Sequence, residues 1–228
     1  NFKLNRGGEA LGLFRADASV VDQILPEFPA QETDVSYGLG MFGDTVGRGY
    51  MLEPTPGEPN QQIYEGYVEE RVQISLGGGI YDEPVEVRLE TAAGDLPIHY
   101  TTDGSLPSFT NGQLYTEPLT IDSITTLRAG VVRPNFITQH VSTSTYIFLD
   151  DVLTQGQPEG YPDLNSGDYD MDPDIAVSQQ YRERLLQGLR DIPTMSVVLP
   201  VDSLMGPDGV YTNSLQRAAE WERAASFE

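Results

Sequence analysis

Cysteine is absent from this chain of 228 residues, and histidine occurs only twice, as His99 and His140. The missing cysteine excludes a disulfide framework, a thiolate nucleophile and any zinc site built on cysteine. Two histidines far apart in the sequence leave little scope for imidazole chemistry, and neither has a second histidine or a carboxylate at metal-ligand spacing. Most common catalytic and metal-binding arrangements are therefore poorly represented in this composition.

Basic residues are also scarce, with 13 Lys and Arg against 35 Asp and Glu and a formal net charge of -22. A protein that binds nucleic acid needs clustered cations to neutralise phosphates, so DNA and RNA are excluded as partners. No apolar run approaches the roughly 20 residues that span a bilayer, so this segment is not expected to cross a membrane. With 39% hydrophobic residues, the chain can still build folded cores.

The residues that are present favour short strands. Apolar bursts at 10–14, 19–24 and 34–38 are separated by turn residues, a pattern typical of a small β-sandwich. Residues 54–60 (PTPGEPN) contain three prolines, which can continue neither a helix nor a central strand. We therefore expect a first, partial sandwich over residues 1–63.

A second module is expected over residues 64–149. The segments 84–89 and 97–101 alternate apolar and polar side chains, and further strands are predicted around 121, at 126–132 and at 144–149. About seven strands at this spacing predict an Ig-like or fibronectin-like sandwich. Val87, Leu89, Tyr146 and Phe148 are its predicted core residues.

The remaining sequence has a different composition. Residues 150–176 form an acidic linker, and no Lys or Arg occurs between Arg133 and Arg182. Over 177–228 we expect one helix followed by strands. Val177, Tyr181, Leu185 and Leu189 fall on one helical face, and Pro193 ends the run. Residues 194–199 predict a buried strand and 214–225 a second helical stretch, so the predicted fold class is mostly β: tandem Ig/fibronectin-like sandwiches, then an acidic linker with one helix.

Three successive segments each resemble a known module. The first resembles the C-terminal part of a bacterial lamin-tail domain, through FKL at 2–4, GE at 8–9, LGLF at 11–14, DVSYG at 34–38 and PTPGEPN at 54–60. The second resembles the fibronectin-like C-terminal module of chitobiases and related hexosaminidases, through GGGIY at 77–81, PV at 84–85, IHYTTDGSLP at 98–107, LY at 114–115 and LRA at 127–129.

The third segment resembles the start of a CotH-type spore-coat domain, through DYDMDP at 168–173, IPTMSV at 192–197, GVYTN at 209–213 and EWER at 220–223. The kinase-like catalytic segment of that family has no counterpart in these residues. Together the resemblances imply a slice of a larger extracellular or cell-surface bacterial protein, with other modules or subunits of a surface assembly as partners. Its enzymatic part, if the protein has one, would lie outside this sequence.

An acidic run is the main candidate metal site, and calcium is its candidate ion. Oxygen ligands at alternating positions around Gly167 match what Ca²⁺ takes, because alternate residues of a curled loop face the same way. The candidate ligands are Asp163, Asn165, Asp168, Asp170 and Asp172. The run departs from the EF-hand pattern, since its twelfth position is Asp174 and not Glu. The alternative is a solvated linker whose aspartates cap the following helix.

Other candidates have simpler explanations in the sequence. Asp103 precedes Gly104 and is interpreted as a turn residue of a hairpin, not as a catalytic carboxylate. The glycines at 77–79 predict a bend between strands, because no Walker-type Lys or Ser/Thr follows. Carbohydrate binding needs aromatic platforms, and the alternative for these side chains is half-buried packing in strands. The available tyrosines are Tyr64, Tyr67, Tyr81, Tyr100 and Tyr115.

The sequence supports three functional hypotheses. The first is a non-catalytic extracellular structural or adhesion segment, because no catalytic nucleophile motif or phosphate loop was found. The second is an accessory region of an enzyme, either a glycoside hydrolase or a CotH-like atypical kinase. The third is a subunit of a filament or surface layer, because sandwich modules expose edge strands that pair with neighbours.

Overall fold

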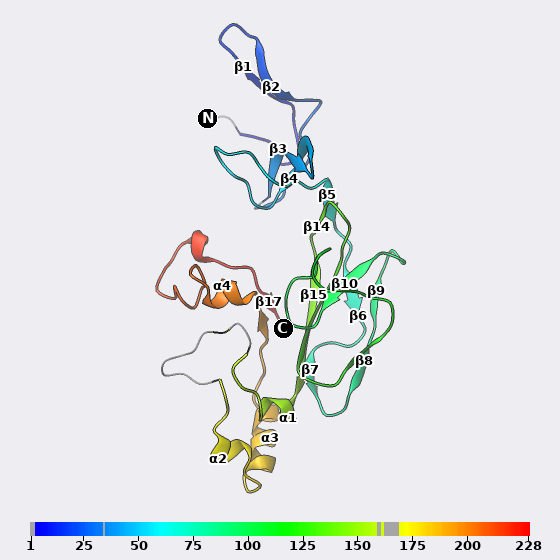
Figure 1. Cartoon of the computed structure of the whole chain (residues 1–228), viewed down its shortest axis with the longest axis vertical. Coiled ribbons are helices and arrows are strands. Elements are labelled where there is room, and N and C mark those ends of the chain that lie inside the picture. The colour runs from blue at the N-terminus through cyan, green and yellow to red at the C-terminus, as the bar shows by residue number, and fades with distance from the viewer. Residues whose placement is uncertain (1–2, 34, 159–160, 162–168) are drawn as a thin grey trace. The chain divides into compact units, whose positions relative to one another are not determined.

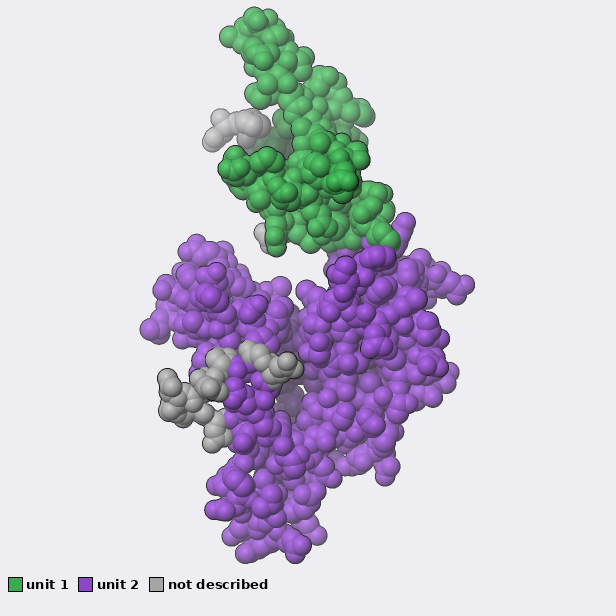
Figure 2. Space-filling model, in the orientation of Figure 1, with its two compact units in different colours: residues 1–67, 134–137 green, residues 68–133, 138–228 purple. Residues whose placement is uncertain are grey.

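The computed structural model describes residues 3–33, 35–158, 161 and 169–228. The chain divides into two compact units, coloured in Figure 2: unit 1 holds residues 1–67 and 134–137, and unit 2 holds residues 68–133 and 138–228. Strands dominate both units, and the described helices are short. The predicted mostly β fold class is confirmed.

Unit 1 is built from two hairpins. Strand β1 (Leu11–Phe14) pairs with β2 (Val20–Ile24), and β3 (Ser36–Phe42) pairs with β4 (Thr45–Met51). The sequence pattern predicted the first three strands but not β4, whose alternating glycines lower its β propensity. Gly49 has a packing reason, because a Cβ at this position would lie only 2.5 Å from the carbonyl oxygen of Tyr64. The close approach of two backbones therefore requires glycine.

The buried centre of unit 1 lies around Tyr50. Its ring centroid lies 5.2 Å from that of Tyr37 and 4.6 Å from that of Tyr67, and Met51 and Ile63 are buried nearby in the chain. Residues 134–137 also belong to this unit although unit 2 flanks them in the sequence. Here strand β5 (Gly66–Val68) pairs with β14 (Phe136–Thr138).

Unit 2 is organised by a five-stranded sheet in the order β11-β10-β13-β15-β7. Figure 1 labels β10, β15 and β7 of this sheet. Neighbouring strands are antiparallel except β15 and β7, which are parallel. The strands are β11 (Gln113–Leu114), β10 (Ile98–Thr101), β13 (Thr125–Val131), β15 (Val141–Phe148) and β7 (Gly79–Tyr81). Strand β13 lies in the middle and is paired on both sides.

Two shorter strand pairs complete the fold of unit 2. They are β6 (Val72–Ile74) with β9 (Leu89–Thr91), and β8 (Val85–Val87) with β12 (Leu119–Ile121). Strand β6 contacts both β13 and β15. The single strand predicted over 84–89 is divided at Arg88, because Arg88 exchanges hydrogen bonds with Ser75 outside either ladder. The four predicted core residues are confirmed as buried: Val87, Leu89, Tyr146 and Phe148.

The C-terminal part of unit 2 carries most of the helix. It begins with the short helix α1 (Leu149–Val152), which directly follows β15. The later elements are α2 (Pro173–Ala176), α3 (Arg182–Asp191), β16 (Val197–Val198), α4 (Val201–Met205), a 3₁₀ turn (Ala219–Trp221) and β17 (Ser226–Phe227). No helix among the described residues is both long enough and apolar enough to cross a membrane.

Two helix predictions need correction. The helix expected from Val177 begins only at Arg182, because the chain turns at Ser178, whose carbonyl accepts the amides of Tyr181 and Arg182. Val177 is 74% exposed, whereas Leu185 and Leu189 are half-buried on α3. The helix expected over 214–225 is wrong except for the 3₁₀ turn. Ala218 there has a φ of 151°, which no helical residue adopts.

Two tyrosines with buried hydroxyls make a matched pair for testing these cores. Tyr146 is 0% exposed and its hydroxyl donates to the carbonyl of Leu76 at 2.6 Å, whereas Tyr67 is half-buried and its hydroxyl has no partner among the described residues. Because a lost buried hydrogen bond costs about 1 kcal/mol, we expect Tyr146→Phe to lower the free energy of unfolding by that amount. Tyr67→Phe should leave it unchanged or raise it. Urea unfolding at pH 7 measures both.

The same variants test the behaviour at alkaline pH. Burial raises the pKa of Tyr146 to about 12, and burial also raises the pKa of Tyr67 to about 12. A raised pKa means that the folded state favours the neutral phenol, so this stability is present below pH 10 and is lost as pH rises through 12. In Tyr146→Phe the free energy of unfolding should fall less steeply above pH 10 than in the parent protein. An identical fall in the variant and the parent would contradict the raised pKa of Tyr146. Tyr211→Phe, at an exposed site, is the control.

Candidate functional site

The two faces of the five-stranded sheet differ in chemistry because side chains alternate along each strand. On β13, Leu127, Ala129 and Val131 point into the core of unit 2, and all three are fully buried. Arg128 lies between them and faces the opposite side, which we call the outer face. Its cross-strand neighbour on β15 is Thr143, and Thr145 lies opposite Thr126. The outer face therefore presents hydroxyls and one guanidinium.

A pair of short strands from the C-terminal end of the chain covers this outer face. Strands β16 and β17 pair antiparallel, and next to them the backbones of Ser196 and Glu228 exchange two hydrogen bonds of 3.0 Å each. We call β16 and β17 together with Ser196 and Glu228 the cover. Its strands are only two residues long, so they depend on the sheet beneath them for stability.

Hydroxyl groups make most of the contacts between the cover and the sheet. Thr143 Oγ1 donates to Ser226 Oγ at 2.9 Å, and the hydroxyls of Thr145 and Ser196 lie 2.7 Å apart. The backbone amide of Thr145 donates to Glu228 Oε2 at 2.8 Å. The pairing of β15 with β7 begins at Tyr146, opposite Gly79, so the carboxylate binds a backbone donor next to the end of that ladder. The contact is largely polar, and Val198 of β16 is the buried apolar side chain of the cover.

Arg128 lies beneath the cover and is only 6% exposed. Its Nη1 donates to the carbonyl of Gly104 and its Nη2 to Ser226 Oγ, both at 3.3 Å, while Nε has no partner among the residues that the structure describes. Burial lowers the pKa of the Arg128 guanidinium. A buried cation that meets only neutral oxygens costs free energy, so the cover closes over this side chain against a desolvation penalty.

The turn that supplies the Gly104 carbonyl was predicted from Asp103 and Gly104. Asp103 Oδ1 accepts from the backbone amide of Ser105 at 2.9 Å and from its hydroxyl at 2.6 Å, and these bonds lower the pKa of Asp103. Gly104 has a φ of 80°. The turn interpretation is confirmed, but the turn does not close a two-residue hairpin, because β10 continues through a longer loop to β11.

Two ion pairs attach helix α3 within unit 2. Arg182 pairs with Asp150 of α1, and Arg190 pairs with Asp82 just after β7. All four side chains are partly exposed, so each pair contributes little free energy individually. They lie at the two ends of α3, which fixes the direction of the helix more than it adds stability.

The predicted calcium ligands are only partly described. Asp163, Asn165 and Asp168 lie outside the described residues, whereas Asp170 and Asp172 lie within them. Asp172 Oδ1 accepts from the backbone amide of Asp174 at 2.9 Å and caps α2, which is the role in the linker alternative. Among the residues that the structure describes, no group of three or more His, Asp or Glu could hold a metal ion. Calcium binding stays a prediction.

The five candidate sugar-binding tyrosines do not form one platform. Tyr64 and Tyr67 belong to unit 1, while Tyr81 lies 5.7 Å from Tyr146 and donates to the carbonyl of Gly77. Tyr100 and Tyr115 lie edge to face with centroids 6.4 Å apart. Tyr115 also lines an open groove of about 640 Å³ with Glu90 and Asp95, so this pair remains the best placed for a glycan.

The remaining sequence candidates have structural roles. A Cβ at Gly78 would lie 2.7 Å from the carbonyl oxygen of Thr145, which explains a glycine at this bend. His99 stands on β10 with its ring centroid 6.3 Å from that of Phe109, and within the described ranges its buried Nδ1 has no partner. His140 precedes β15. Arg223 donates to the carbonyls of Glu220, Glu222 and Asp208, so it holds the chain around Trp221.

Sequence reasoning missed the residues under the cover. Arg128 interrupts the otherwise uncharged stretch of β13, and a charged side chain in a strand with partners on both sides signals that the second face is also used. Thr143, Thr145 and Ser226 gave no such signal, because hydroxyls on strands are ordinary surface residues. Only the folded chain brings Ser226 next to them.

The comparisons with known proteins match one part of the chain. Residues 87–146, about a quarter of the 228, match the model of the family described as Fn3 associated. The match supports a fibronectin-like associated module, as in chitobiase-type proteins, within the segment expected at 64–149. No curated protein and no solved structure matches the chain.

Replacing Arg128 tests the cost of burying its charge. Because a buried, unpaired cation is unfavourable, we expect Arg128→Met to leave the free energy of unfolding unchanged or to raise it by about 1 kcal/mol. The exposed, ion-paired Arg88 is the matched control, and Arg88→Met should leave the stability nearly unchanged. A loss of more than about 2 kcal/mol in Arg128→Met would show that the guanidinium is well compensated.

Asp172 separates the calcium prediction from its alternative. Asn caps helices as well as Asp does, so Asp172→Asn should preserve the cap of α2 while removing a negative charge from the candidate calcium site, and Asp172→Ala should remove both the cap and the ligand oxygens. If the predicted site exists, calorimetry gives a saturable calcium isotherm that weakens in both variants. A change in melting temperature that is the same in calcium and in sodium chloride of equal ionic strength contradicts the site.

Proposed function

We propose that this chain is a non-catalytic structural and adhesion segment of a larger extracellular bacterial surface protein. The observation that carries the proposal is the covered outer face, on which the fibronectin-like sheet holds a segment that follows it in the chain. Residues 196–198 and 226–228 are fixed to β15 by side-chain hydrogen bonds, not only by the connecting chain. A sandwich that anchors the following segment in this way fixes the orientation of the next module and transmits mechanical force to it.

The chemistry of the described residues supports a structural role. The hydroxyl groups of the outer face form hydrogen bonds within unit 2. The Asp103 carboxylate is likewise bound within its own turn. The strongly acidic composition, with a net charge of -22, favours solubility and disfavours nucleic acid and anionic lipid as partners. The partners proposed are other protein modules or subunits of a surface assembly.

The assignment of the flanking segments belongs to this proposal. Residues 1–63 are proposed as part of a lamin-tail-like sandwich, 64–149 as the fibronectin-like module, 150–176 as a linker and 177–228 as the start of a CotH-like domain. The sequence resemblances and their order support this arrangement. The family match supports only the middle module.

The second candidate function is an accessory region of an enzyme whose catalytic part lies outside these residues, a glycoside hydrolase or a CotH-like atypical kinase. The match at 87–146 favours it, because the module is of the kind found in chitobiase-type proteins. The groove beside Tyr115, with Glu90 and Asp95 on its walls, offers the aromatic and acidic groups that sugars use. A glycan would be the ligand in this case.

The docking of the cover is tested by removing two hydroxyls without changing side-chain shape. In Thr143→Val with Thr145→Val, two hydrogen bonds worth about 1 kcal/mol each are lost, so local opening should become about 30-fold more frequent. Hydrogen exchange of the Ser196 amide, which is bonded across the cover, measures this opening. Thr120→Val, at an exposed position of β12, is the control and should change nothing.

The outcomes separate the proposals. If the Ser196 amide of the parent protein exchanges without protection, the cover is not docked and the anchoring role is wrong. Titration of the same NMR sample with a chitin oligosaccharide tests the second candidate. Saturable shifts at Tyr115 that are lost in Tyr115→Ala support it. Turnover of ATP or of the oligosaccharide by the 228-residue chain, lost on changing a named side chain, overturns the non-catalytic proposal.

A further inference from the structure

The hairpin β1–β2 of unit 1 exposes its apolar side chains on both faces. All four residues of β1 are exposed, including Leu13 at 61% and Phe14 at 56%, and Val20, Val21 and Leu25 are exposed as well. A two-stranded hairpin is only marginally stable in water by itself, and an apolar one that buries nothing gains little from folding. This arrangement is characteristic of a surface that another polypeptide covers.

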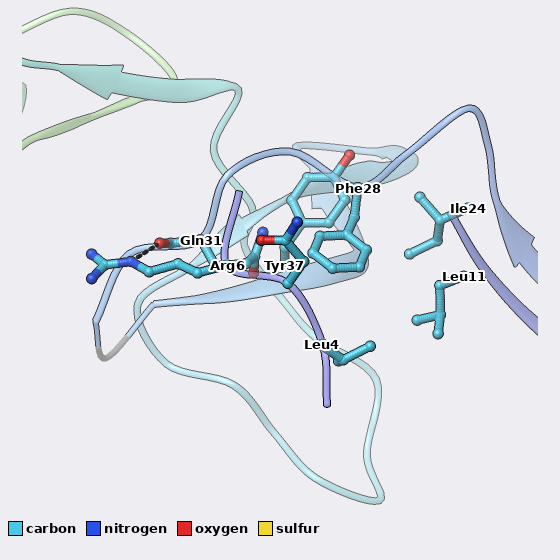
Figure 3. Close-up of a pocket in the computed structure, with 8 residues that line it drawn as sticks. Leu4, Arg6, Leu11, Ile24, Phe28, Gln31 and Tyr37 are labelled. Carbon is cyan, nitrogen blue, oxygen red and sulfur yellow. Dashed lines mark hydrogen bonds between the residues drawn. The ribbon is translucent and has the colours of Figure 1, made fainter. Parts of the chain in front are cut away.

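An apolar pocket opens beside the base of the hairpin (Figure 3). Leu11 of β1 and Ile24 of β2 lie on one side. The other lining residues are Leu4, Phe28 and Tyr37 together with the polar residues Asn5, Arg6 and Gln31. Its volume of about 250 Å³ is smaller than the usual pocket for a drug-sized molecule, about 300–1,000 Å³. The pocket therefore suits a single large apolar side chain better than a free ligand.

The polar residues at the pocket are already engaged. Arg6 Nε donates to the carbonyl of Gln31 at 2.9 Å, and its Nη2 pairs with Glu32 at 3.0 Å. Figure 3 shows the bond between Arg6 and Gln31 beside the apolar side chains. An incoming group consequently meets hydrocarbon and has no free cation to bind, which favours an apolar anchor over an acidic one.

The two edges of the hairpin are not equivalent. On the β2 side, Arg48 Nη2 binds Asp22 Oδ1 at 2.6 Å and the carbonyl of Gln23 at 3.2 Å, so a side chain blocks that edge. Strand β1 has β2 as its only paired strand among the described residues. Its sequence Leu-Gly-Leu-Phe has no charge and no proline, the residues that usually protect an edge from pairing.

Charge selects the kind of strand that could pair with β1. Residues 9–27 carry four acidic side chains and one basic one, namely Glu9, Asp17, Asp22, Glu27 and Arg15. A strand with basic flanking residues gains from this excess, and an acidic strand is repelled. A second copy of this chain is disfavoured for the same reason, because each copy has a net charge of -22.

We infer that the free edge of β1 and the adjoining pocket form a docking surface for an extended polypeptide strand of a partner protein. The partner strand adds to β1 through its backbone, places one large apolar side chain into the pocket beside Leu11, and carries basic residues at its ends. This combines edge pairing for affinity with a side-chain pocket for specificity. The surface belongs to unit 1, and the inference does not depend on the function proposed from the cover.

Synthetic peptides added to the full 228-residue chain test this inference. The probe is Arg-Thr-Val-Thr-Leu-Thr-Val-Thr-Arg; one comparison peptide has Glu in place of both Arg, and another has Pro in place of the central Leu. We expect saturable binding of the first peptide by calorimetry, with the largest NMR shifts at the amides of β1. At least tenfold weaker binding is expected for the other two.

Matched variants locate the site. Leu11→Asn changes a residue of the pocket and of β1, and should weaken binding at least tenfold; Leu13→Asn, farther from the pocket, should weaken it less. Val46→Asn is the control, because Val46 is an exposed apolar residue on β4 of the same unit, 67% exposed against 61% for Leu13 and 36% for Leu11. The inference is overturned if the first peptide shows no saturable binding at millimolar concentration, if the Pro peptide binds equally well, or if Val46→Asn weakens binding as much as Leu11→Asn. Equal binding of the Glu peptide overturns the basic partner, and sedimentation as a dimer without peptide identifies a second copy as the occupant.

Discussion

Strand β13 is covered on both of its faces, and the arrangement of unit 2 depends on this constraint. Leu127, Ala129 and Val131 fill the core on one side, so the side chains between them must face the other way. Strands β10 and β15 satisfy the backbone of β13 at both edges. What remains is the outer face around Arg128, and the chain returns from its C-terminal end to cover it.

The two coverings differ in their physics. The inner face is closed by apolar side chains, whose burial is the main favourable term in folding and depends little on exact geometry. The outer face is closed by hydroxyls, one carboxylate and the side chain of Val198, over a buried guanidinium that has no acidic partner in the described part of the chain. Hydrogen bonds of this kind exchange with bonds to water, so their net gain is small. The cover is therefore expected to open more easily than the apolar core beneath it.

Unit 1 shows the opposite imbalance. Its centre around Tyr50 is well packed, yet the β1–β2 hairpin leaves large apolar groups in contact with water beside a pocket. Arg48 fixes one edge of the hairpin and leaves the other available. In both units, the candidate functional surface carries an unfavourable free energy that its immediate neighbours do not compensate. In unit 2 this is the burial of Arg128, and in unit 1 it is the exposure of apolar side chains on the β1–β2 hairpin. Such surfaces indicate where contacts with other segments form.

The sequence alone determined the features that depend on local pattern. The alternation around Val87, Leu89, Tyr146 and Phe148 identified a buried face, and Asp103 with Gly104 identified a turn, because residues next to each other in the chain decide both. The mostly β class followed from the same signals. The sequence did not determine where α3 begins, which depends on the turn at Ser178, whose carbonyl accepts two backbone amides. Nor did it determine that 214–225 forms only a 3₁₀ turn and no α-helix. Only the tertiary structure decided the candidate sites: Arg128 and Ser226 are 98 residues apart, and the pocket joins Leu4, Leu11, Phe28 and Tyr37. The proximity of these residues depends on how strands distant in the sequence pair, and the local periodicity of the sequence does not contain that information.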